Sequence, residues 1–192
     1  MQDPHFFGYG SLVNRQTHAY PDARRARLAG WRRVWQPTRL RGLRFLSVHA
    51  VENGQIEGLI ARVPGADWAA LDLREQAYLR QPVEVDLADG GAAVGVEVYQ
   101  TDPVHLVPGD ASQPVLLSYL DTVVQGFLAE FGPDGVSRFF ATTDGWPAHV
   151  LDDRTAPIYP RAKELTDGEI ALVDSHLEAL GCVKRHASQL AR

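Results

Sequence analysis

Apolar and polar residues alternate with a period near two through most of the first hundred positions, which is typical of β-strands. Asn53-Gly54 is a strong short hairpin signal, so we expect the apolar runs on either side of it to pair. Asp89-Gly90-Gly91 predicts a second hairpin in the same way. The pattern predicts strands over residues 5–9, 28–37, 43–51, 56–63, 83–87 and 93–99.

Helical spacing of apolar residues replaces this alternation in four segments. An aspartate stands before the first segment as an N-cap, and Gly132-Pro133 ends the second. The last segment begins with the capping-box spacing Thr-Asp-Gly-Glu and ends at Gly181. Because strands crowd the first half and helices the second, we expect an α+β fold. The predicted helices span residues 67–79, 115–131, 135–142 and 166–180.

The composition fits one globular domain over residues 1–192, with 45% hydrophobic and 22% charged residues. We find no apolar run near the ~18 residues that a membrane span needs, and the N-terminus lacks the pattern of a signal peptide. A cytoplasmic protein without a membrane partner is therefore expected. The single cysteine, Cys182, is interpreted as a structural thiol.

The net charge of −5 hides a basic segment, because eight arginines lie between Arg24 and Arg44. Such a cluster, with Trp31 and Trp35 inside it, suits nucleic-acid binding. The strand-like spacing around the arginines favours another interpretation, in which they cover the solvent face of paired strands. We therefore expect no nucleic-acid partner, and the oligomeric state stays open.

The string FGYGSL, residues 7–12, is the first candidate for chemistry. A strand end, two glycines and a serine together allow several backbone N–H groups to point at one anion. The string matches neither of the common phosphate-binding patterns, and a tight turn with an exposed serine is the plain alternative. Ser11 also lacks the second glycine of a GxSxG nucleophile elbow, so a serine hydrolase is not expected.

Glu75 is the second candidate. In the predicted helix it lies four residues after Leu71 and four before Leu79, next to the apolar stripe. Burial there raises the pKa of a carboxyl group and suits it to general acid–base catalysis. The alternative is an ordinary surface glutamate, because Arg74 is adjacent and glutamate is a good helix former.

The seven histidines show no metal-ligand spacing, so neither a metal nor another cofactor is expected. Tyr119 lies among apolar helix positions, where a core role is the ordinary interpretation. The polar string DDRTAPIYPR, residues 152–161, is interpreted as a surface loop that folds over a cleft.

FGYGSL near the start, LDLREQAY some sixty residues later and SYL in a following helix resemble the gamma-glutamylcyclotransferase-like superfamily, with its ChaC and AIG2-like branches. The resemblance covers roughly residues 5–130, and the DDRTAPIYPR string is similar to bacterial members. It implies a small mixed, mostly antiparallel β-barrel with flanking helices. It also implies a cofactor-independent reaction, in which the amine of a gamma-glutamyl compound attacks its own gamma-carbonyl to give 5-oxoproline and a free amine.

The resemblance also assigns roles to residues. It implies that the backbone of Gly10, Ser11 and Leu12 holds the alpha-carboxylate or amine region of the substrate, and that Tyr9 and Tyr119 line the pocket. Glu75 matches the glutamate that takes a proton from the substrate amine and returns it to the departing amine.

The sequence departs from other branches of the superfamily at Leu12-Val13, at the end of the FGYGSL turn, and at Gln76-Ala77, after Glu75. Glutathione, a gamma-glutamyl amino acid and a gamma-glutamylamine therefore all stay open as substrates. A non-catalytic protein that binds a small carboxylate in the same pocket is the alternative function.

Overall fold

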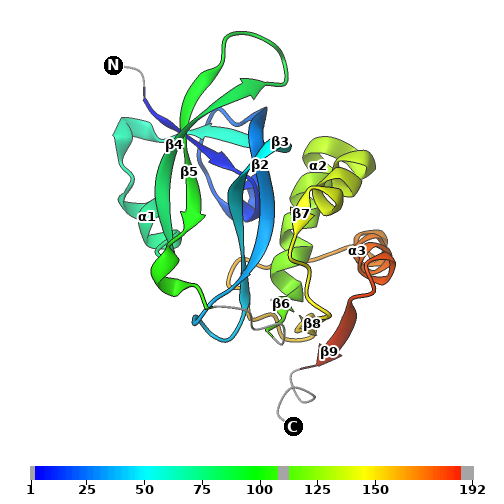
Figure 1. Cartoon of the computed structure of the whole chain (residues 1–192). Coiled ribbons are helices and arrows are strands. Elements are labelled where there is room, and N and C mark those ends of the chain that lie inside the picture. Colours follow the sequence, from blue (N-terminus) through cyan, green and yellow to red (C-terminus); the bar gives the residue numbers. More distant parts are fainter. Residues whose placement is uncertain (1–2, 108–112, 187–192) are drawn as a thin grey trace.

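The computed structural model describes residues 3–107 and 113–186, and a closed five-stranded β-barrel lies at its centre (Figure 1). The barrel order is β3-β1-β5-β4-β2, and β2 pairs back with β3 to close it. Only β1 and β5 pair in parallel within the ring, which confirms the mixed, mostly antiparallel barrel. The barrel strands are β1 (His5–Gly8), β2 (Arg24–Pro37), β3 (Arg44–Arg62), β4 (Tyr78–Leu87) and β5 (Val94–Thr101).

The predicted hairpin at Asn53-Gly54 is wrong, because β3 runs through it without reversing. Both halves of β3 pair with β2, and the register jumps from Ala29↔Gln55 to Trp31↔Ala50. Residues 51–54 thus form a bulge opposite Gly30, which bends the two-stranded ribbon. The chain reverses instead between Pro37 and Arg44, the last pair of the β2–β3 ladder.

The second predicted hairpin is confirmed. β4 and β5 pair antiparallel up to Val85↔Val94, and the turn between them contains Gly90 and Gly91 at φ 84° and 114°. These positive φ values favour glycine, so the local sequence alone specifies this turn.

The first predicted helix is shorter than expected. α1 (Ala69–Arg74) ends before Glu75, which is its C-cap. Residues from Tyr78 onward join β4 instead, and Leu79 is 46% exposed rather than in the core. The full-length pairing of β4 with β5, which starts at Tyr78↔Thr101, satisfies more backbone groups than another helical turn would.

The other helices follow the sequence pattern closely. α2 (Leu117–Ala141) spans most of both predicted segments, and its backbone leaves the helical region at Gly132, with φ 69°. α3 (Asp167–Ala179) carries the expected capping box between Thr166 and Glu169. Short 3-10 turns are η1 (Ser11–Val13), η2 (Arg15–Thr17), η3 (Pro64–Ala66) and η4 (Pro103–His105).

A small parallel sheet, absent from the prediction, lies beside the barrel in the order β6-β8-β9 (Figure 1). It links the start of α2 to the segment after α3. A further short strand, β7, pairs in parallel with β2 outside the closed ring. The bounds are β6 (Val115–Leu116), β7 (Thr143–Asp144), β8 (His149–Asp152) and β9 (Val183–His186).

The main core lies between the barrel and α2, where Phe127 and Phe139 are almost fully buried. Gly126 brings α2 close to the loop after η1, since a Cβ there would lie 2.6 Å from the Asn14 backbone nitrogen. Within the described part of the chain, no helix is long and apolar enough to cross a membrane.

Most arginines of the basic segment have partners inside the molecule. Arg24, Arg25, Arg27 and Arg32 form ion pairs with acidic side chains, and Arg33 is buried. The structure thus accounts for much of the basic cluster by internal pairing.

Candidate functional site

Tyr9 follows β1 directly and is held on two sides. Its side chain is 6% exposed, and its hydroxyl donates to the Tyr99 carbonyl at 2.6 Å. Its own carbonyl accepts a hydrogen bond of 2.9 Å from Nε of Arg33. The backbone that leads into the FGYGSL turn is therefore fixed by a buried network.

Arg33 is an unusual member of this network because it is only 1% exposed. Its guanidinium also donates to the Thr142 hydroxyl and the Glu57 carbonyl. It lies 4.8 Å from the ring centre of Phe127, in cation–π geometry. Burial lowers the pKa of Arg33 to about 9. The sequence alone did not single out this positioning residue among the eight arginines.

Gly10 and Ser11 lie against Tyr119, although α2 supplies the tyrosine from far along the chain. A Cβ on Gly10 would lie 2.8 Å from the Tyr119 hydroxyl, so glycine is needed for this approach. The Ser11 backbone N–H forms a hydrogen bond with the same hydroxyl. Leu12, in contrast, packs its side chain in the core with Leu71, so only its backbone is left for a ligand.

Glu75 lies near the turn because Arg74 connects them. Nε of Arg74 lies 3.0 Å from Oε1 of Glu75, and the two side chains are 7% and 16% exposed. The same guanidinium donates to the Ser11 hydroxyl at 3.1 Å and to the Thr17 carbonyl at 3.0 Å. The carboxylate and the FGYGSL turn therefore belong to one partly buried cluster.

Burial raises the pKa of the Glu75 carboxyl above its ordinary value. The positive charges of Arg74 and Arg161 oppose this rise, as does the hydrogen bond with Arg74. Burial also raises the pKa of the Tyr119 hydroxyl, and the negative charge of Glu75 adds to the effect. The site thus combines a carboxyl group with a shifted pKa and a tyrosine that stays protonated.

Tyrosine rings line this cluster. Tyr119 packs edge-to-face on Tyr159 with ring centres 5.1 Å apart. Tyr78 stacks on Phe45, and burial together with the charge of Glu75 raises its pKa. The sequence interpretation missed Tyr78, which it placed in a helix, and it treated Arg74 only as an argument against Glu75.

Residues 153–164, which we call the strap, lie between β8 and α3 and are anchored on α2. Asp153 accepts hydrogen bonds from the Ser118 N–H at 2.8 Å, the Ser118 hydroxyl at 2.6 Å and the Ile158 N–H at 2.8 Å. At the other end, the Gln125 amide donates to the Glu164 carbonyl at 3.0 Å. The loop at residues 152–161 therefore lies against α2.

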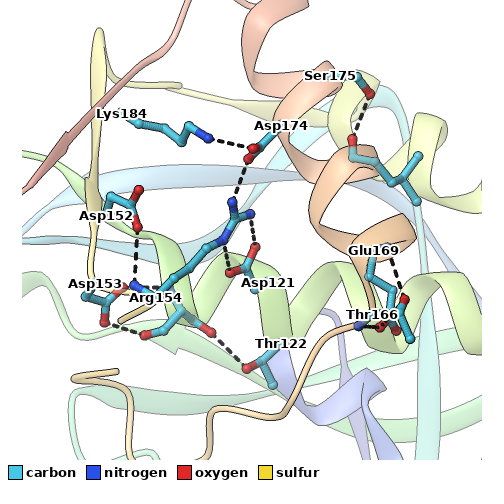
Figure 2. A network of polar contacts seen from close by, with 12 residues as sticks. Asp121, Thr122, Asp152, Asp153, Arg154, Thr166, Glu169, Asp174, Ser175 and Lys184 are labelled. Carbon is cyan, nitrogen blue, oxygen red and sulfur yellow. Dashed lines mark hydrogen bonds and ion pairs between the residues drawn. The ribbon is translucent and has the colours of Figure 1, made fainter. Parts of the chain in front are cut away.

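An ion-pair network adds to this anchoring (Figure 2). Arg154 of the strap forms two hydrogen bonds with Asp121 of α2 and a third with Asp174 of α3. Lys184 of β9 contacts the other oxygen of Asp174. Asp121 is only 3% exposed, so dissolved salt screens its ion pair with Arg154 less than it screens a surface ion pair.

Five of the six residues predicted for the site lie together: Tyr9, Gly10, Ser11, Glu75 and Tyr119. The sixth, Leu12, packs its side chain in the core, which leaves for a ligand the backbone that the prediction assigned to it. The cause of Glu75 burial also differs from the prediction, since the residue caps α1 rather than lining a helical stripe. Within residues 3–107 and 113–186, no three histidine, cysteine, aspartate or glutamate residues cluster in a way that could hold a metal ion.

Solved structures share this fold at low sequence identity. A gamma-glutamyl cyclotransferase has a TM-score of 0.59 and 14% identity over 91% of this chain and 99% of its own. An uncharacterised protein from Homo sapiens, loc79017, has a TM-score of 0.60 and 14% identity over the same shares. YkqA from Bacillus subtilis has a TM-score of 0.60 and 18% identity, over 77% of this chain and 56% of its own.

A search of curated proteins finds no match. The family model "Gamma-glutamyl cyclotransferase, AIG2-like" matches residues 6–119, which is more than half of the 192-residue chain. The matched region contains the turn, Glu75 and Tyr119. This chain belongs to the AIG2-like gamma-glutamyl cyclotransferase family.

Proposed function

We propose that this protein converts a gamma-glutamyl compound to 5-oxoproline and a free amine, with Glu75 as the general base and acid. The observation that carries the proposal is the position of Arg74, whose guanidinium contacts both the Glu75 carboxylate and the Ser11 hydroxyl. Arg74 thereby joins Glu75 and the FGYGSL turn, which are far apart in the sequence, in one site. Family membership supplies the reaction class.

The proton transfers balance with one carboxylate. The neutral alpha-amine of the substrate attacks the gamma-carbonyl carbon, and Glu75 takes the proton that the attacking nitrogen loses as the new C–N bond forms. The carbonyl then reforms, the bond to the departing nitrogen breaks, and Glu75 gives that nitrogen its proton. Because the nucleophile belongs to the substrate, holding the folded substrate supplies much of the rate acceleration.

Tyr119 is suited to stabilise the oxyanion of the tetrahedral intermediate. Its hydroxyl accepts from the Ser11 N–H, and burial keeps it protonated. Among the described residues, no acceptor takes its proton, which leaves that proton for a ligand oxygen. A preorganised donor of this kind in a partly dry site favours the transition state over the ground state.

The Glu75–Arg74 ion pair also favours a second function, in which the site binds a small carboxylate without turnover. A carboxylate that is already paired with a guanidinium is a weaker base than a free one. The same guanidinium could hold the carboxylate of a bound metabolite. The two functions share a pocket and differ in whether 5-oxoproline is formed.

Turnover of a gamma-glutamyl panel separates them. We expect purified protein to release 5-oxoproline from at least one member among glutathione, gamma-glutamyl amino acids and gamma-glutamylamines. Glu75→Gln should lower kcat/KM by about 100-fold or more, whereas Glu84→Gln, an exposed glutamate on β4, should not. Full activity of Glu75→Gln would refute the mechanism. Saturable binding with no 5-oxoproline from any member would favour the binding protein.

A further inference from the structure

Arg161 is the one strap residue whose charge acts on Glu75, and it is partly buried. Within the part of the chain that the structure describes, its guanidinium has neither a hydrogen-bond acceptor nor an ion-pair partner. Arg74 differs, since it contacts Glu75, Ser11 and Thr17. Arg161 therefore brings a positive charge to the site that no described acceptor or acidic side chain contacts.

The charge balance at the site points to an anionic ligand. Two guanidinium groups, of Arg74 and Arg161, act on the single carboxylate of Glu75. The tyrosines around them are neutral, because burial raises the pKa of Tyr9, Tyr78 and Tyr119. When Glu75 is ionised, the cluster keeps one uncompensated positive charge.

The strap holds Arg161 in a defined place. Tyr159 donates its N–H to the Ser118 hydroxyl at 3.3 Å, and its ring packs on Tyr119. The N–H of Ala162 returns to the Tyr159 carbonyl at 3.1 Å, which makes a turn with Arg161 inside it. The network of Arg154 with α2 and α3 supports the same segment (Figure 2). The backbone that carries Arg161 is therefore ordered before a ligand binds, which lowers the entropic cost of binding.

We infer that Arg161 binds the alpha-carboxylate of the gamma-glutamyl substrate, an inference that rests on the proposed function. Once the alpha-amine is neutral, this carboxylate is the remaining charge of the glutamyl part. A carboxylate taken from water into the site without a partner would bind poorly. Arg161 follows Tyr159, whose ring packs on Tyr119 next to Gly10, and a guanidinium at this place can supply two directed donors for it.

Three probes distinguish this carboxylate from one on the departing amine. They are gamma-glutamylethylamine, its alpha-carboxamide analogue and gamma-glutamylalanine, which carries a second carboxylate on the leaving side. Arg161→Gln should lower kcat/KM for the first and third about 10- to 100-fold and leave the carboxamide unchanged. Arg161→Lys should recover part of the loss. Lys163→Gln removes a neighbouring charge of the strap and should leave kcat/KM for all three probes unchanged.

Binding of the product tests the inference without turnover. Wild-type protein should bind 5-oxoproline more tightly than its carboxamide in calorimetric titration, and Arg161→Gln should abolish the difference. A wild-type protein that does not distinguish the two, or a loss confined to gamma-glutamylalanine, would overturn the role of Arg161 while leaving turnover intact. Carboxylate-selective binding without 5-oxoproline release would instead refute the proposed function and keep the role of Arg161.

Discussion

The guanidinium of Arg74 donates to the Ser11 hydroxyl across 3.1 Å, although 63 positions separate the two residues. Nε of the same guanidinium lies 3.0 Å from Oε1 of Glu75. Arg74 therefore holds the carboxylate near the turn and opposes the rise of its pKa that burial causes.

Removing the Arg74 charge should shift the pH dependence of activity. Glu75 must be ionised to take a proton, so kcat/KM should rise as the pH passes through the Glu75 pKa. Arg74 lowers that pKa against the effect of burial. In Arg74→Gln the pKa rises, and the acidic limb of the pH–rate profile should move to higher pH.

Arg24→Gln is the matched control, since Arg24 pairs with the exposed Asp89 far from this cluster. Its profile should coincide with that of the wild type. An acidic limb that stays in place in Arg74→Gln, or moves to lower pH, would contradict the assignment of Glu75 as the base.

The stability of the protein should depend on pH through Glu75. The pKa of Glu75 in the folded state lies above the ordinary value of 4.5. Below pH 4.5 the carboxyl group is therefore protonated in both the folded and the unfolded state, and it costs no stability in that range. As the pH rises through the folded pKa, the folded state is destabilised relative to the unfolded one. Glu75→Gln should therefore gain Tm over the wild type at pH 7 and not at pH 4.

Thermal melts at both values measure this difference, and each kcal/mol corresponds to roughly 2–4 °C for a chain of this size. Glu84→Gln, which changes an exposed carboxylate, should show no such trend. A Tm gain that is equal at both pH values would mean that packing, not ionisation, causes the change.

A methyl group at Gly10 should disturb Tyr119. The Cβ of Gly10→Ala would lie 2.8 Å from the Tyr119 hydroxyl and 3.2 Å from Cδ2 of Leu46. We expect a loss of about 1–3 kcal/mol in unfolding free energy and a clear loss of activity. Adding Tyr119→Phe removes the overlapping oxygen, so the double variant should regain stability but not activity.

Denaturant unfolding and 5-oxoproline release are the two measurements. Gly168→Ala is the control, because its Cβ would meet nothing closer than 3.9 Å. Equal stability of Gly10→Ala and the wild type would show that Tyr119 moves away at no cost.

Asp153 should contribute more to the free energy of unfolding than Asp152 does. Asp153→Ala removes the acceptor of the Ser118 and Ile158 N–H groups at the start of α2 and in the strap. We expect it to cost about 2–4 kcal/mol, the sum of a lost helix cap and an unpaired buried donor. Asp152→Ala loses a contact of 3.2 Å with the Arg154 N–H and should cost less than about 1 kcal/mol.

Chemical denaturation gives both free energies. The loosened strap should also raise KM in Asp153→Ala, because Tyr159 and Arg161 lose their support. Similar free energies for the two alanine variants would show that the strap is held mainly by the Arg154 network.

Local sequence signals predicted a large part of the fold. The turn at Gly90-Gly91, the capping box at Thr166 and the break at Gly132 all lie where the residues themselves favour those conformations. Asn53-Gly54 carried an equally strong signal and was misinterpreted, because a bulge and a hairpin can use the same residues. The difference depends on β2, which pairs with both halves of β3.

In the candidate site, too, some features follow from the local sequence and others from tertiary contacts. The sequence by itself determined that an FGYGSL turn follows a strand and that a helix begins a few residues before Glu75, because these features depend on neighbours a few residues away. Only the tertiary structure decided that Arg74 joins them, that Tyr119 lies over Gly10 and that the strap brings Arg161 near Glu75. Burial and pairing depend on groups distant in the chain, and barrel closure brings those groups together.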